Sequence, residues 1–532
     1  MTDLPPTGAR PYATRRRALQ TLAAGAAGAV APGLRAQPGA GAAVAGQRAP
    51  LQIVGPWEIS GLAPAASGYV FTRLQIAETL VDADDEGTLL PGLAQRFEAS
   101  ADGRTWRFAL RPGARFHDGT AVQARAVVRC LEDARRPPSL LSTAPIQAIE
   151  AEDEATVRVR LSTPHAALPA LLAHSSTLVL APSSYGTDGA VRSIVGSGPY
   201  RITTLAAPQR VETAAFDGHG GPRPAVGRVA YLAAGRSETR ALMAEAGQAD
   251  LAYGLDPASV VRLRRRARVR VESVTLPRSV AIKINAGMPA LRDPRVRRAL
   301  SLCIDRAGIA RALLRDPGLA ATQLFPPTLR AWHAPAIEPL AHDPGAAARL
   351  LAEAGWRRGA GGLQDAQGEP LRLSLRTFPD RPELPLIATA LQAQWREAGI
   401  AVRVDVGNSG DIPLGHRDGS LQLALIARNY ATTPDPTSTL AQDFGPGGGD
   451  WGAMGWSDAR VAQALAALLA GGLDAGRAAA LRLQVVHALQ AELPVIPVAW
   501  YRQAVAVSAR LDGVHLDPLE RSYRLTAMGW RA

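Results

Sequence analysis

A strand, a helix and a second strand follow one another directly in the last third of the chain. Apolar and polar residues alternate over residues 371–378, as in a strand with one buried face. Leu391 and Trp395 then continue an apolar stripe at helical spacing, which ends at Gly399. Residues 401–406 alternate again. Such a βαβ unit needs parallel strands joined by a right-handed crossover, so the sequence predicts an α/β fold.

The basic character of the chain comes almost entirely from one residue type. The 532 residues carry a formal net charge of +12, and Lys283 is the only lysine among 59 basic residues. This indicates a compositional bias towards arginine rather than a binding patch. The arginines between residues 262 and 270 straddle a predicted helix end and a strand without interleaved aromatic residues, which favours a solvated face over a nucleic-acid site.

The N-terminus has the pattern of an export signal. Residues 14–17, T-R-R-R, precede a mild apolar stretch at residues 22–34, and small residues near Ala36 and Ala45 offer cleavage points. We interpret residues 1–45 as a twin-arginine-like signal and linker, which predicts a soluble protein in the periplasm. A membrane anchor is disfavoured, because the apolar stretch is shorter than the ~20 residues of a span.

Signatures of catalysis are missing from the sequence. It contains no G-x-S-x-G, no H-E-x-x-H and no phosphate-binding loop. No two histidines have the spacing that places two metal ligands on one helix face. Cys130 and Cys303 are far apart in sequence and are interpreted as small buried hydrophobic residues. The glycines of residues 447–452 match a dinucleotide-binding pattern, but no strand leads into them. We therefore predict no enzyme, no cofactor and no protein-bound metal.

Short motifs along the chain resemble the peptide/nickel/opine family of extracytoplasmic solute-binding proteins, family 5, which serve ATP-driven (ABC) importers. They occur in the family's order and extend over nearly all of the chain after the signal. They are ETLV at 78–81, PGLA at 91–94, DGRTW at 102–106, LRPGARFHDG at 110–119, GSGPY at 196–200, IN at 284–285, DPRVRRAL at 293–300, IDR at 304–306, LLAEAGW at 350–356 and DP at 435–436.

The resemblance implies a two-lobed periplasmic-binding-protein fold (type II) with a hinge and an extra subdomain in lobe I. Lobe I is expected at residues 46–280, with the subdomain at about 84–184, and lobe II at residues 281–499. Residues 500–532 would return to lobe I. Strand-like runs at the two expected crossings agree with this division, and a ligand would be trapped by hinge closure.

The candidate ligand contacts are polar and aromatic residues near the expected cleft. The loop after the apolar run 421–427 is one source, because ligands of open α/β sheets bind beyond the carboxyl ends of strands. The predicted contacts are Tyr69, Phe71, Arg428, Asn429, Tyr430, Thr432, Asp435, Trp451, Trp456 and Trp500. For the aromatic members, packing in the core remains the alternative.

The position of Thr432 bears on the ligand. In peptide-binding members of the family an acidic residue three positions before the Asp-Pro pair holds the ligand's α-amino group, and here that position is Thr432. Thr432 has no charge to offer, whereas Arg428 would favour a carboxylate. We therefore predict an anionic or amide-rich small molecule, such as a modified peptide, an opine-like compound or a metal chelate.

The expected partners are a small-molecule or peptide ligand and the permease and ATPase subunits of an importer, with the binding protein itself a monomer and no nucleic acid. Two other functions remain open on the same fold, an exported enzyme and a sensory or chaperone-like binding protein. The absence of catalytic motifs counts against the enzyme.

Overall fold

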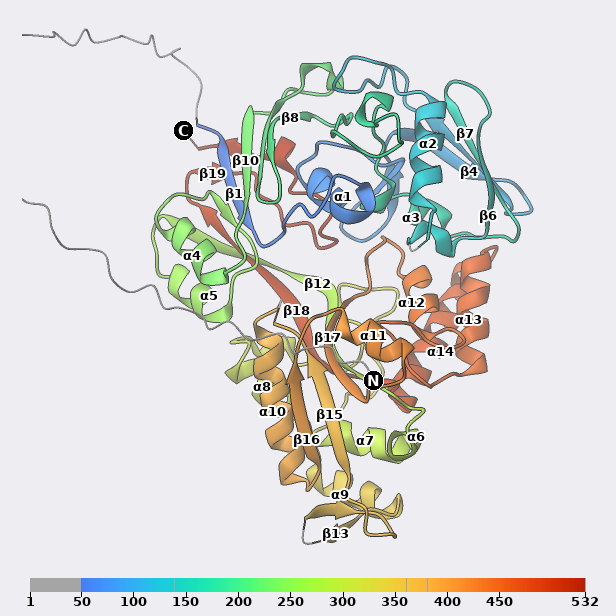
Figure 1. Ribbon diagram of the computed structural model, residues 1–532, viewed down its shortest axis with the longest axis vertical. Helices are drawn as coiled ribbons and strands as arrows, with labels where there is room; N and C mark the ends of the chain where they lie inside the picture. Colours follow the sequence, from blue (N-terminus) through green and yellow to red (C-terminus); the bar gives the residue numbers. More distant parts are fainter. Residues whose placement is uncertain (1–48, 138, 360, 380, 532) are drawn as a thin grey trace, which may run out of the picture. The chain divides into compact units, whose positions relative to one another are not determined.

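The computed structural model describes residues 49–531 apart from residues 138, 360 and 380. The predicted export signal lies outside the described residues. The centre of the fold is a ten-stranded mixed sheet of order β16-β15-β17-β12-β18-β11-β1-β10-β9-β8 (Figure 1), which confirms the α/β class. Within the described part of the chain, every helix is too short or too polar to cross a bilayer.

Two long strands, β12 (Val269–Ile284) and β18 (Val495–Ser508), are neighbours in the middle of this sheet. They lie between β17 on one side and β11 on the other. They pair antiparallel along nearly their whole length, but the register shifts between Leu276 and Ser279. Two large hydrophobic cores lie on either side of that irregularity, one built mainly from residues 51–253 and the other from residues 280–499. The strand-like runs predicted at the two crossings are thus confirmed as strands.

The first core is covered by the part of the sheet in which β1 lies parallel to both β10 and β11. Its strands are β1 (Leu51–Gly55), β8 (Tyr200–Ala206), β9 (Arg210–Ala215), β10 (Arg228–Ala233) and β11 (Leu251–Ala252), and its helices are α1 (Pro64–Arg73), α4 (Ser237–Glu245) and α5 (Pro257–Leu263). The chain returns here after β18, where β19 (Leu511–Asp512) pairs with β20 (Gly529–Trp530).

A separate antiparallel sheet of order β4-β5-β7-β6 extends the first core. The strands predicted at residues 105–110 and 156–161 are confirmed as β5 and β7. The elements of this region are β2 (Val81–Ala83), β3 (Leu89–Pro91), β4 (Ala94–Ala99), β5 (Thr105–Leu110), α2 (Ala124–Ala134), β6 (Ile146–Ala151), β7 (Thr156–Leu161) and α3 (Leu168–Leu171). Cys130 on α2 and Cys303 are both free and buried, as predicted.

The second core contains the predicted βαβ unit. β15 (Arg372–Thr377) pairs in parallel with both β16 (Ala401–Val406) and β17 (Leu423–Asn429), and α10 (Glu383–Glu397) connects β15 to β16. The remaining elements of this half are α6 (Pro289–Arg292), α7 (Pro294–Leu302), α8 (Arg306–Ala312), α9 (Pro344–Glu353), β13 (Arg357–Gly359), β14 (Gly362–Gln364) and α11 (Asp411–Arg417). Three further helices, α12 (Thr437–Phe444), α13 (Ala459–Ala470) and α14 (Ala475–Glu492), pack in a third buried cluster.

Local capping explains where two of these helices begin. Asp293 accepts a hydrogen bond from the amide of Arg295 at the start of α7, and Asp343 accepts one from Ala346 at the start of α9. In each case a proline occupies the first helical position, where its missing amide proton costs nothing. Both helix starts agree with the sequence.

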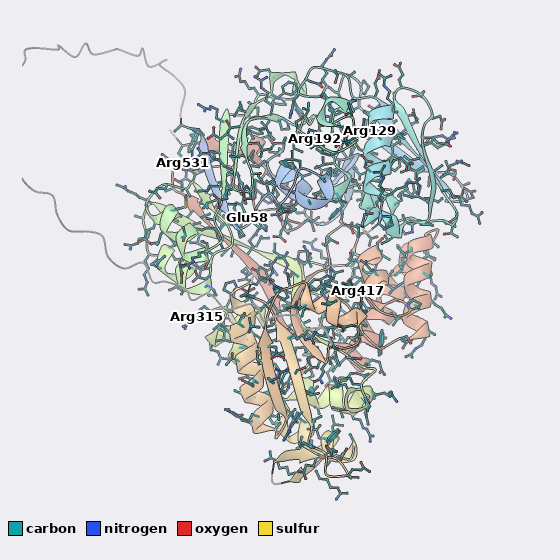
Figure 2. All side chains as sticks on the ribbon, viewed as in Figure 1. Glu58, Arg129, Arg192, Arg315, Arg417 and Arg531 are labelled. Atoms are coloured by element: carbon teal, nitrogen blue, oxygen red, sulfur yellow. The ribbon has the colours of Figure 1, made fainter. Side chains whose placement is uncertain are left out.

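The arginines are spread over the molecule (Figure 2). Arg129 and Arg417 lie on α2 and α11, Arg192 is in a loop of the first half, and Arg531 is near the C-terminus. This distribution agrees with a bias in composition, since these positions belong to distant parts of the chain.

Candidate ligand-binding site

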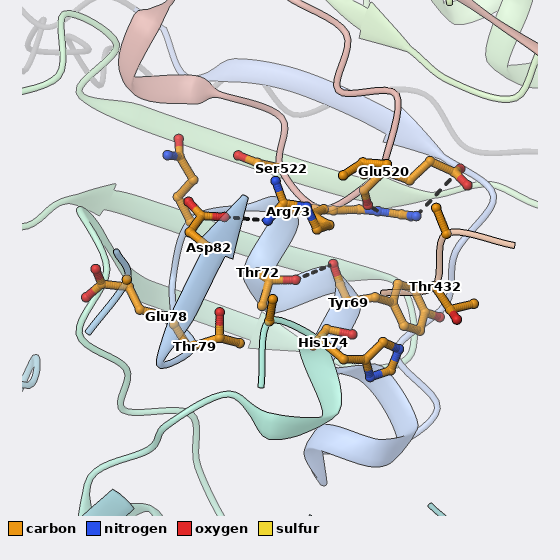
Figure 3. A pocket seen from close by; sticks show the side chains of 18 of the residues that line it. Tyr69, Thr72, Arg73, Glu78, Thr79, Asp82, His174, Thr432, Glu520 and Ser522 are labelled. Atoms are coloured by element: carbon orange, nitrogen blue, oxygen red, sulfur yellow. Dashed lines mark hydrogen bonds and ion pairs between the residues drawn. The ribbon is translucent and has the colours of Figure 1, made fainter. Parts of the chain in front are cut away.

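A cavity of about 380 Å³ lies where segments of the two halves meet (Figure 3). One wall comes from residues 69–82, which include the end of α1, and from residues 519–526 of the C-terminal return. Asn429 at the end of β17, Ala431 and Thr432 in the loop after it, and Arg278 of β12 also line the cavity. The cavity thus has walls from both halves and adjoins a strand that joins them.

Helix α1 supplies three polar side chains to the cavity at neighbouring positions, Tyr69, Thr72 and Arg73. Residues three and four apart lie on one face of a helix, so Tyr69 and Arg73 fall side by side. The Tyr69 hydroxyl donates to the carbonyl oxygen of Glu58 at 3.1 Å. The Arg73 guanidinium lies over the Trp57 ring at 4.1 Å and the Tyr69 ring at 5.4 Å. These contacts hold the guanidinium in one orientation.

Glu520 binds two guanidinium groups at once. Arg278 Nη2 donates to Glu520 Oε2 at 2.6 Å, and Arg73 Nη2 lies 3.7 Å from Oε1. Arg73 Nε also donates to the Glu520 carbonyl oxygen at 2.7 Å. All three side chains are at most 10% exposed. Burial by itself would raise the pKa of Glu520, but the nearby arginines lower it below its ordinary value.

Arg278 reaches the cavity because of the irregularity in β12. It lies between Leu276 and Ser279, where the pairing with β18 changes register. A break of this kind redirects a side chain that a regular strand would hold in the sheet face. The guanidinium of Arg278 lies 5.0 Å from the centre of the Tyr501 ring. Arg381 is at the same distance from this ring and donates to the Tyr501 hydroxyl at 3.0 Å.

The other end of the cavity has acidic groups that are already paired. Glu78 Oε1 accepts from Arg111 Nη2 at 3.0 Å, and His219 Nε2 lies 3.8 Å away. Burial acts to raise the pKa of Glu78, but hydrogen bonding to His219 and the charge of Arg111 outweigh it and lower the pKa. Asp82 forms an ion pair with Arg521. Neither carboxylate is an unpaired negative charge.

Three of the residues predicted from the sequence line this cavity: Tyr69, Asn429 and Thr432. The Asn429 side-chain oxygen accepts from the amide of Ala431 at 3.0 Å, and the Thr432 hydroxyl shares a hydrogen bond of 3.0 Å with that of Thr439. The last residue of β17 and one residue of the following loop therefore line the cavity.

Four predicted aromatic contacts pack in cores and do not line the cavity. Phe71 is fully buried, on the face of α1 that turns into the first core. Tyr430 packs edge-on against Phe325 at 5.2 Å. Trp500 is buried with its indole nitrogen donating to the Gln323 carbonyl at 3.1 Å, and Trp456 lies in a third buried cluster.

Three further predicted contacts are also placed elsewhere. Arg428 forms a two-pronged ion pair with Asp443 at 2.7 and 2.9 Å, so its charge is already neutralised. Asp435 accepts from the amide and hydroxyl of Thr437 at 2.8 and 2.6 Å and thereby orders the start of α12. Trp451 packs edge-on against Phe378. None of the three lines the cavity.

The buried arginine pair was not predicted from the sequence. Arg73, Arg278 and Glu520 are separated from one another by more than 200 residues, and none lies in a motif of the predicted site. The second half of β12, residues 276–284, is apolar apart from Arg278, Ser279 and Lys283, and a charged residue in such a run was the available signal for Arg278. Among the described residues, no cluster of three or more His, Cys, Asp or Glu side chains could hold a metal ion.

Comparison with known proteins gives a consistent result. Residues 88–451 match the model of bacterial extracellular solute-binding proteins, family 5 Middle. The glutathione-binding protein GsiB of Escherichia coli strain K12 is 29% identical over 284 residues, which are 52% of this chain and 55% of GsiB. The chain thus aligns with about half the length of this curated relative.

Solved structures extend the likeness to the whole described fold. NikA from Brucella suis, in complex with Fe(III)-EDTA, has a TM-score of 0.81 and 23% identity, with 91% of this chain and 100% of NikA covered. The binding protein AgaA from A. tumefaciens R10, in complex with agropinic acid, has a TM-score of 0.76 and 20% identity, covering 91% and 98%. These likenesses confirm the two-lobed periplasmic-binding-protein fold.

Proposed function

Because the chain belongs to the bacterial extracellular solute-binding proteins of family 5, we propose that it is the substrate-binding component of an ABC importer. It captures a small solute outside the cytoplasm and delivers it to permease and ATPase subunits in the membrane. The protein acts as a monomer and performs no chemistry on the solute. Residues 1–45 serve as its export signal.

The observation that carries this proposal is the position of the cavity. Its lining comes from residues 69–82 and 519–526 of the first half and from Asn429, Ala431 and Thr432 of the second. β12, which supplies Arg278, and β18 are the strands that join the two cores. A solute held there would contact both lobes, so that it stabilises the closed arrangement over an open one.

The size and polarity of the cavity favour a small peptide, a peptide-like compound or a metal chelate. About 380 Å³ falls within the usual range for small-molecule sites, and polar or charged side chains from three segments can fix the orientation of a solute. The names of the compared proteins, which mention glutathione, Fe(III)-EDTA and agropinic acid, agree with this range of ligands.

Small-angle scattering tests the proposal when combined with analysis of the bound solute. Protein freed of its solute by unfolding and refolding should become more compact when the solute is returned. Its stability should rise by about 2.7 kcal/mol at a solute concentration 100 times the dissociation constant. Recovery of the solute chemically unchanged is expected. A scattering profile that does not respond to a bound solute, or conversion of the solute to a product, would contradict the proposal.

A further inference from the structure

The group formed by Arg73, Arg278 and Glu520 contains two positive charges and one negative charge. One positive charge therefore has no counterion within the group. Among the described residues, Glu520 is the one carboxylate within 4.0 Å of either guanidinium. Arg381 and Glu383 are charged neighbours of Arg278 and add one charge of each sign. The buried carboxylate of Asp517 lines a small pocket with Arg73 and Glu520, but it accepts from the backbone amides of Leu519, Arg521 and Ser522. A buried charge without a counterion is unfavourable, because it has lost its hydration without gaining a partner.

Hydrogen bonding in the same group is also incomplete. Arg73 Nη1 and Arg278 Nε are both buried, and neither has a hydrogen-bond partner within the described part of the chain. Buried donors are nearly always satisfied in folded proteins, so two such donors around one carboxylate call for an explanation. Burial lowers the pKa of Arg278, and the neighbouring Arg381 and Arg73 oppose the effect of Glu520.

The backbone at the cavity is held in a conformation that side chains rarely adopt. Glu520 has φ of +57° and Gln75 has φ of +53°, and both line the cavity. Non-glycine residues in the left-handed region are uncommon and concentrate at functional sites. The fold therefore maintains the position of Glu520 between the two arginines against a local preference.

We propose that Arg73 and Arg278 form a carboxylate-binding site, and that a carboxylate of the solute binds beside Glu520 and supplies the missing negative charge. This inference rests on the proposed function and specifies the chemistry of its solute. A guanidinium binds a carboxylate through two parallel hydrogen bonds, and both arginines line the cavity with one donor each still without a partner. Because the surplus is a single charge, a singly charged carboxylate balances it better than a doubly charged phosphate.

An ammonium group is a poorer fit at this site. Arg278 and Arg73 already contact opposite oxygens of Glu520, and Gln503 Nε2 lies 3.4 Å from Oε1. A cation beside Glu520 would add a third positive charge around one carboxylate. The sequence predicted that Arg428 binds an anionic group of the ligand. The proposed site gives this role to Arg73 and Arg278 instead.

Isothermal calorimetry with a matched pair of probes tests this assignment. The probes are N-acetyl-trialanine, which has one carboxylate, and N-acetyl-trialanine amide, which has no charge. The wild-type protein should bind the acid at least tenfold more tightly than the amide. Arg278→Gln should abolish this preference, and Arg278→Lys should retain only part of it, because lysine keeps the charge but loses the two-pronged geometry.

A control variant separates the site from the general charge of the protein. Arg417→Gln removes the same charge from a side chain that is 59% exposed and lies outside the cavity, and it should keep the full preference. The solute-free Arg278→Gln protein should unfold at a temperature no lower than the wild type. The reason is that the remaining Arg73 and Glu520 form a balanced pair.

Several outcomes would overturn the carboxylate site. They are equal affinities of the wild type for the two probes, no measurable binding of either probe, and an unchanged preference in Arg278→Gln. Stronger competition by inorganic phosphate than by acetate at equal ionic strength would also overturn it. If any of these occurs while an uncharged solute co-purifies with the protein, the importer function stands and only the carboxylate site is wrong.

Discussion

At the scale of single residues, Glu520 is the side chain on which the cavity most depends. Glu520→Gln keeps the shape but removes the one charge between Arg73 and Arg278. We expect this variant to lose about 3–5 kcal/mol of stability at neutral pH, because two buried guanidinium groups lose their counterion. Urea unfolding followed by circular dichroism measures the loss. A loss below 1 kcal/mol would contradict the role assigned to the ion pair.

Glu520 also predicts a dependence of stability on pH. Its pKa is lowered in the folded protein, whereas a glutamate in the unfolded chain has a pKa of about 4.3. On acidification the unfolded chain takes up this proton first. The stabilisation is therefore complete above about pH 4.3 and is lost as the pH falls through the folded pKa. Unfolding curves at a series of pH values should show a shallower acid decline for Glu520→Gln than for the wild type.

The residues of the cavity show what can and cannot be predicted from the sequence. Tyr69 and Thr432 line the cavity, and both were predicted from signals that a sequence can show. Arg428 does not line it, because it pairs with Asp443 on the next helix, and a sequence does not reveal which charges pair. Arg73 and Glu520 are 447 residues apart and become neighbours through the C-terminal return to the first half.

At the scale of elements, the prediction was good where a pattern is periodic. The βαβ unit, the strands at residues 105–110 and 156–161 and the capped starts of α7 and α9 follow from side-chain alternation and capping chemistry. Most of the predicted aromatic contacts lie in cores, because an aromatic residue in an apolar segment is as suitable for a core as for a ligand. Burial of Phe71 and Tyr430 depends on the packing of distant segments.

The glycine-rich loop after α12 owes its shape to a buried lysine. Lys283 Nζ donates to the carbonyl oxygens of Gly449 and Gly452 at 2.7 and 2.6 Å. Burial lowers the pKa of Lys283 to about 8, whereas a lysine in the unfolded chain has a pKa of about 10.4. Between these values the unfolded chain holds more protons, so this residue makes stability rise with pH.

Replacement of the lysine tests that account. Lys283→Met should remove the rise in stability between about pH 8 and pH 10, and should destabilise the protein at pH 7 by about 1–3 kcal/mol, since two buried carbonyl groups lose their donor. Chemical unfolding at pH 7, 8, 9 and 10 measures both effects. Wild-type stability that falls steadily over this range, in parallel with the variant, would contradict the predicted contribution.

At the scale of the whole molecule, contacts between the two halves are expected to control closure. The amide of Ala166, in the first half, donates to the carbonyl oxygen of Leu469 at the end of α13 at 2.7 Å. A Cβ atom on Gly471 would lie 2.6 Å from the Cβ of Ala166. Gly471→Ala should therefore separate this contact and favour a more open arrangement.

Gly472 offers a matched control for that variant. It has φ of +70°, close to the +78° of Gly471, but a Cβ there would meet open space. Both alanine variants place a side chain at positive φ, which costs about 1–3 kcal/mol of backbone strain. Only Gly471→Ala should increase the radius of gyration and the rate of solute release. Equal scattering profiles and release rates for the two variants would show that the contact has no part in closure.

Native mass spectrometry of the freshly purified protein tests most directly whether this molecule captures a solute. We predict a population with one small molecule bound per chain, lost on denaturation, whose released mass corresponds to a compound containing a carboxylate and fitting a cavity of about 380 Å³. Arg278→Gln purified in parallel should carry less of it. A wild-type protein that never retains a small molecule, even when purified from cells grown in rich medium, would contradict the account.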